Sequence, residues 1–168
     1  MCCLSAVRRW WHRRGFGVQS PWAYEFVTDA LFDRHRYYAF DTLNGTPGDE
    51  QLFRIMNWLR PRRYIAASET NSAVRHMNAA FKALRDENKT DCELYYFAAD
   101  RTWEVAKALK GGWVGEHTCM IIEGIDRRET QPLWQQLVAS PLTTSTFDLG
   151  TRGIVFFDPA RQKQNYQL

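Results

Sequence analysis

The chain lacks glycine at the place where nucleotide-binding folds most need it. Residues 64–72 (YIAASETNS) have the pattern of a core strand running into a helix, and the turn between them contains no glycine. In nucleotide-binding α/β proteins, glycines at this turn let the backbone approach the ligand and free the helix N-terminus to hold it. The sequence therefore has the outline of a cofactor site without the residues that usually form one.

Cysteine and histidine are too scattered to form a metal site. The four cysteines are Cys2, Cys3, Cys92 and Cys119, and no two of them form a C-x-x-C pair. No histidine lies at ligand spacing from another ligand, so the pattern excludes a zinc framework. Cys119 falls inside a predicted strand and Cys92 lies directly before one, which is typical of buried, reduced thiols. We expect no metal site.

Long apolar runs and catalytic motifs are also missing. No segment approaches the length of a transmembrane helix, and the N-terminus has no apolar segment of the signal-peptide type. We therefore expect a cytoplasmic protein without a membrane partner. The sequence contains no Gly-x-Ser-x-Gly, phosphate-loop or zinc-protease motif, so it identifies no catalytic residue.

The composition is that of one globular domain with a mild positive charge. The 168 residues are 45% hydrophobic and 24% charged, and the net charge is only +3. This charge is too small to indicate a nucleic-acid partner. The basic excess gathers around Trp10 and Trp11, at Arg8, Arg9, Arg13 and Arg14. Such a cluster suits phosphate binding, but we favour a solvated arm or helix whose Trp residues pack on the domain, because one short cluster is a weak motif.

The first third of the chain predicts helices. Ser20 before Pro21 is a strong helix start, and apolar residues then recur at helical spacing as far as residue 31. Turn residues at 44–48 predict a loop. A second helix is expected over 49–59, with Pro61 ending it.

The rest of the chain alternates between strand and helix patterns. This rhythm predicts a Rossmann-like α/β fold: a mostly parallel sheet of about five strands that ends in an antiparallel hairpin. We expect a single domain over 1–168, in which an N-terminal helical segment, 1–60, packs on an α/β core, 61–168. The expected strands are 64–67, 93–98, 118–122, 143–147 and 153–157, and the expected helices are 72–84 (capped by Ser72), 103–109 and 132–139.

Two segments resemble a bacterial branch of the class I S-adenosylmethionine-dependent methyltransferases. Residues 15–22 (GFGVQSPW), followed by 26–27 and 37–39 (YYA), are similar to that branch's Gly-(Ile/Val)-His-Ser-Pro-Phe stretch and its later Tyr-Tyr motif. Residues 120–125 (MIIEGI), Trp134, 147–149 (FDL) and 153–157 (GIVFF) are similar to its last three strands. The resemblance implies a sheet ending in an antiparallel hairpin and S-adenosylmethionine as the cofactor.

The departures from the family pattern fall on the cofactor half of the fold. The family's first strand leads into Glu-x-Gly-x-x-x-Gly, whereas this chain has Ala66 or Ala67 and then residues 68–72 (SETNS). Non-glycine residues resist the positive φ that such turns use, although Asn71 tolerates it. Asp100 is the only candidate for the ribose-binding acid, but its spacing to Glu123 better suits the family's fourth strand. The family's second and third strands would then be missing.

The acidic pair that the family places after its penultimate parallel strand has also changed. This chain has Glu123-Gly124 and then Asp126, so the geometry for a divalent ion is not assured. We interpret these carboxylates as loop residues balanced by Arg127 and Arg128.

Three hypotheses follow. The first is a methyltransferase-like protein with a degenerate cofactor site, which acts by binding a partner protein or an altered small ligand, without a cofactor. The second is an active methyltransferase that binds S-adenosylmethionine through an atypical turn. The third is a nucleic-acid-binding module that uses the arginines of residues 8–14. If a cofactor site is retained, its residues would be Ser68, Glu69, Asn71, Asp100 and Glu123. The carboxyl ends of parallel strands form the usual binding crevice, so we expect Ser68, Glu69, Asp100, Arg101 and Glu123 to converge there.

Overall fold

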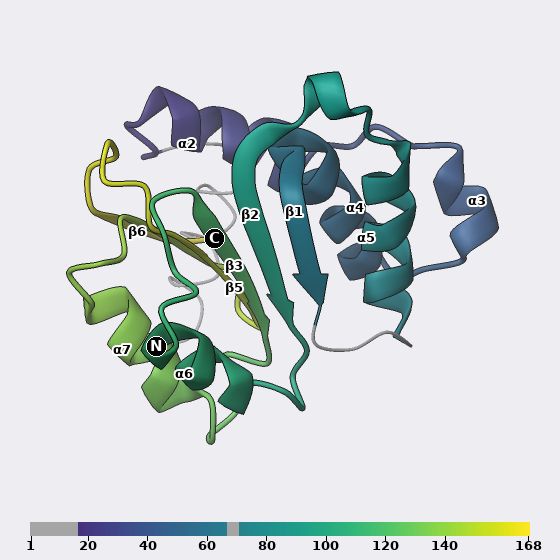
Figure 1. The fold of residues 1–168 in the computed structure, drawn as a ribbon. Coiled ribbons are helices and arrows are strands. Elements are labelled where there is room, and N and C mark those ends of the chain that lie inside the picture. Colours follow the sequence, from purple (N-terminus) through teal and green to yellow (C-terminus); the bar gives the residue numbers. More distant parts are fainter. Residues whose placement is uncertain (1–16, 67–70) are drawn as a thin grey trace. The chain divides into compact units, whose positions relative to one another are not determined.

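The computed structural model describes residues 17–66 and 71–168 (Figure 1). They belong to two compact units. A helical unit contains residues 17–62 and 71–90, and a sheet unit contains residues 63–66 and 91–168. The helix that follows the first strand thus groups with the N-terminal helices and not with the sequence-predicted core. No described helix combines the length and the apolar character needed to cross a membrane.

The helical unit is built from capped helices. Ser20 caps the first one, as predicted, but the helix changes from α to π at Phe26. The helix predicted from residue 49 begins two residues earlier, because Thr46 and Asp49 form a reciprocal capping box. The elements are α2 (Pro21–Glu25), the π-helix η1 (Phe26–Leu31), α3 (Ala39–Leu43), α4 (Pro47–Leu59), α5 (Ser72–Ala83) and the 3-10 helix η2 (Asp86–Asn88).

The sheet has six strands in the order β1-β2-β3-β5-β4-β6. Their bounds are β1 Pro61–Ala66, β2 Thr90–Phe97, β3 Thr118–Glu123, β4 Ser145–Asp148, β5 Arg152–Phe156 and β6 Gln164–Gln167. β1 and β2 point the same way (Figure 1), β2 is parallel to β3, and β4 is parallel to β6. β5 lies antiparallel between β3 and β4. The predicted mostly parallel sheet with a terminal hairpin is confirmed, and β6 is an additional strand.

One face of this sheet packs against α6 (Trp103–Lys110) and α7 (Gln131–Ala139), which lie next to each other (Figure 1). The packing requires a glycine at residue 153 of β5, since a Cβ there would lie 2.5 Å from the Trp134 ring. The indole therefore rests directly on the strand backbone. The buried residues of this core include Tyr95, Phe97, Val105, Ala108, Met120, Ile122, Trp134, Leu137 and Val155.

Candidate functional site

The residues proposed from the sequence for a retained cofactor site are divided among different parts of the chain. Ser68 and Glu69 lie outside the described residues, as do Arg8, Arg9, Arg13 and Arg14. Asn71 belongs to the helical unit, where it is the N-cap of α5 in place of the predicted Ser72. Its Oδ1 accepts a hydrogen bond from the Val74 N–H at 2.8 Å. Its φ of −83° is extended, so the left-handed conformation considered for it is not used.

Asp100 and Glu123 do lie at the same edge of the sheet unit. Asp100 follows β2, and Glu123 is the last residue of β3. These two strands are parallel neighbours, and Phe97 pairs with Ile122. Asp100 is exposed in the turn that leads to α6. The two loops approach closely, because a Cβ on Gly124, whose φ is +71°, would lie 3.0 Å from the Ala99 Cβ. The carboxyl edge of β2 and β3 thus holds two carboxylates, as predicted.

The Glu123 carboxylate is bound within the protein by Arg152. Nε and Nη2 of the guanidinium donate to the same Oε1, at 2.7 and 2.6 Å. The two residues face each other in the antiparallel register of β3 and β5, and their side chains are only 16% and 9% exposed. The interpretation that Arg127 and Arg128 balance this acid is therefore incomplete, because the partner comes from β5. Arg127 instead reaches the carbonyl of Ala99, at 3.4 Å.

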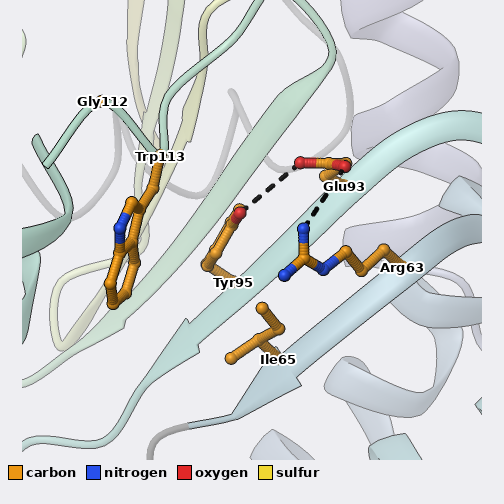
Figure 2. Close-up of a pocket in the computed structure, with 6 residues that line it drawn as sticks. All are labelled: Arg63, Ile65, Glu93, Tyr95, Gly112 and Trp113. Atoms are coloured by element: carbon orange, nitrogen blue, oxygen red, sulfur yellow. Dashed lines mark hydrogen bonds and ion pairs between the residues drawn. The ribbon is translucent and has the colours of Figure 1, made fainter.

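A pocket of about 390 Å³ lies elsewhere in the sheet unit, beside the middle of β2 (Figure 2). β1 supplies Arg63 and Ile65, β2 supplies Glu93 and Tyr95, and the loop after α6 supplies Gly112 and Trp113. Residues two apart on a strand project from the same face, so β1 contributes a charged and an aliphatic side chain, and β2 contributes a charged and an aromatic one. Glu93 pairs with Thr118 and Tyr95 with Met120, so the β2 part of the pocket lies before the carboxyl edge at which Glu123 ends β3.

The polar side of the pocket is built around Glu93. Tyr95 Oη donates a hydrogen bond to Glu93 Oε2 at 3.4 Å, and Arg63 Nη1 lies 3.9 Å from Glu93 Oε1 (Figure 2). The side chains of Arg63 and Glu93 are 59% and 25% exposed. Burial and the negative charge of Glu93 raise the pKa of Tyr95, and the opposing effect of Arg63 is smaller. The phenol therefore remains a protonated donor at neutral pH.

The apolar side of the pocket is aromatic. The Trp113 and Tyr95 rings stack with their centroids 6.3 Å apart and an angle of 25° between their planes. Figure 2 shows Trp113 on one side of Tyr95, and Arg63 with Glu93 on the other. Trp113 directly follows a turn at Gly112, whose φ is +69°, and it is 42% exposed. An exposed indole beside a charged pair suits an amphipathic ligand.

The sequence alone does not identify this pocket. A signal was present in the alternation Arg63, Ile65 and Glu93, Tyr95, followed by Trp113 directly after Gly111-Gly112. This pattern indicates a shared pocket only once β1 and β2 are known to be neighbours in the sheet. Among the described residues, no group of three histidine, cysteine or acidic side chains is placed to hold a metal ion. In comparisons with known proteins, no family model, curated protein or solved structure matches the chain.

Proposed function

We propose that this chain is a non-catalytic small-molecule-binding protein with a methyltransferase-like α/β scaffold, and that it no longer uses S-adenosylmethionine. The observation that carries the proposal is the Glu123–Arg152 pair. A strand-end acid that serves a cofactor or a metal must present its carboxylate to the ligand. Here that carboxylate is largely buried and receives two charge-assisted hydrogen bonds from Arg152.

The strand order gives the proposal further support. If β2 corresponds to the family's fourth strand, the family's second and third strands are missing from this chain. In the part of the chain that the structure describes, β1 is an edge strand with β2 beside it, and no strand lies beyond it. Under that correspondence, the adenosine-binding strands would lie beyond β1, and this order supports the proposal.

The Trp113 pocket gives a small ligand a different place to bind. By this pocket we mean the six lining residues already named. Its volume lies toward the lower end of the range for small-molecule sites, about 300 to 1,000 Å³. It combines an aromatic wall with two charged side chains, which is the usual composition of a ligand site.

Two measurements test this function, one by calorimetry and one by NMR. Titration with S-adenosylmethionine or its demethylated product should give no saturable heat, and Asp100→Ala should behave like the native chain. Micromolar binding of either compound, abolished by Asp100→Ala, would support the methyltransferase hypothesis instead. In the second measurement, a small-molecule screen by NMR should yield ligands that Trp113→Ala loses and Trp103→Ala retains. Trp103 is a matched control because it is also exposed, at 59%, and does not line the pocket.

A further inference from the structure

We propose that the Trp113 pocket binds a free α-amino acid with an apolar or aromatic side chain. The proposal rests on the small-molecule-binding function and names its ligand class. The pocket has three chemical parts, which are a cation, an anion and an aromatic wall. A zwitterionic amino acid has the complement of each part.

The charged side of the pocket matches the two charges of a zwitterion. Arg63 Nη1 and Glu93 Oε1 lie 3.9 Å apart, on neighbouring strands. A free amino acid has its carboxylate and its ammonium group on the same carbon atom, so both charges reach such a pair together. The carboxylate binds Arg63, whose planar fork suits it, and the ammonium group binds Glu93.

Opening the Arg63–Glu93 contact costs little. The pair is partly exposed and at the limit of ion-pair distance, and such pairs contribute at most about 1 kcal/mol. Tyr95 donates a long hydrogen bond, 3.4 Å, to the other oxygen of Glu93, so the phenol does not compete with the ligand for Oε1. A neutral ligand would remove water from Arg63 and Glu93 and supply no opposite charge to either of them.

The aromatic side of the pocket accepts the ligand's side chain. Trp113 is 42% exposed, and Ile65 is only partly buried against the core. Covering these side chains with an apolar group removes apolar surface from water and adds a ring contact when the ligand is aromatic. A phosphorylated or nucleotide ligand is disfavoured, because Arg63 is the one cation among the six lining residues and it faces a carboxylate.

The first test is to titrate the full chain with L-phenylalanine, its amide and its N-acetyl derivative. The amide lacks the carboxylate, and the N-acetyl compound lacks the ammonium group. We expect saturable binding of L-phenylalanine and at least tenfold weaker binding of either derivative. Equal affinity for all three compounds would overturn the proposal, as would tighter binding of a neutral sugar.

Variants assign each charge to its partner. Arg63→Gln should weaken binding of L-phenylalanine and remove the preference over the amide, and Glu93→Gln should remove the preference over the N-acetyl compound. Trp113→Ala should weaken binding at least tenfold, whereas Trp103→Ala should leave it unchanged. Thermal melts check that each variant is folded. If amino acids fail to bind while other ligands bind in a Trp113-dependent manner, the amino-acid assignment is wrong and the small-molecule function stands.

Discussion

The sheet unit contains two arginine–glutamate pairs that differ sharply in their surroundings. Arg152 and Glu123 form a short, largely buried contact at the carboxyl edge, with two hydrogen bonds to one oxygen. Arg63 and Glu93 lie 3.9 Å apart, about 1 Å beyond the length of an ordinary hydrogen bond, and both side chains face the Trp113 pocket. The same two residue types therefore form a short, largely buried pair at the carboxyl edge and a longer, partly exposed pair beside a pocket.

The strand arrangement explains this difference. Glu123 and Arg152 are directly opposed on β3 and β5, which are interior strands with neighbours on both sides. Arg63 lies on β1, an edge strand of the described sheet, so its guanidinium reaches solvent. The Glu123–Arg152 pair is therefore enclosed by neighbouring strands on both sides, whereas the Arg63–Glu93 pair keeps contact with solvent.

The largest expected effect comes from removing the buried cation. Arg152→Met leaves Glu123 charged, largely buried and without its two donors. We expect the free energy of unfolding to fall by about 3 kcal/mol, measured by urea denaturation. The matched variant Arg63→Met should lose no more than about 1 kcal/mol. Equal losses would show that the two pairs are energetically alike and would break the comparison.

A smaller effect is expected at the residue beside Arg152. Gly153→Ala places a methyl group against the Trp134 ring, at a distance that no side chain tolerates without movement. Overpacking should cost about 2 kcal/mol, again by urea denaturation. A second substitution, Trp134→Leu, should reduce the penalty of Gly153→Ala, because it removes the ring. If Gly153→Ala costs as much in the Trp134→Leu background as in the native chain, the close packing of Trp134 on β5 is not the cause of the penalty.

The smallest effect concerns Tyr95 in the open pocket. Its pKa is raised from 10.0 in the folded protein, so the protonated phenol stabilises the fold below pH 10, and this contribution is lost as the pH rises through the folded-state pKa. Tyr95→Phe should cost about 0.5 kcal/mol at neutral pH. The difference between the two proteins should shrink above pH 10 in thermal melts, since phenylalanine does not ionise. A difference that is constant from pH 7 to pH 11 would exclude the proposed role of the phenol.

Much of the sheet could be predicted because its strands are apolar runs between turn residues. The hairpin expected over 143–147 and 153–157 is present at Ser145–Asp148 and Arg152–Phe156. The strand β6 could not be predicted in this way, because its residues Gln164–Gln167 are mostly polar. It depends on long-range partners: Thr146 Oγ1 donates to Asn165 Oδ1 at 2.7 Å, and the Phe147 and Tyr166 rings stack.

The sites were less predictable, because side-chain pairing depends on strand order. The sequence correctly brought Asp100 and Glu123 to one edge, since carboxyl ends of neighbouring parallel strands meet. It did not reveal Arg152 as the partner of Glu123, because the two residues are 29 positions apart and pair only when β5 lies beside β3. The Trp113 pocket was missed for a similar reason, since it combines β1, β2 and a later loop.

The position of β5 also determines when β3 gains its second neighbour during synthesis of the chain. β4 precedes β5 in the sequence, yet β5 is the strand that pairs with β3. As the polypeptide leaves the ribosome, the apolar strand β3 (TCMIIE) therefore has no partner on that side until residues 152–156 have emerged. An unpaired apolar edge is a site for aggregation. The nascent chain thus exposes such an edge throughout the synthesis of α7 and β4.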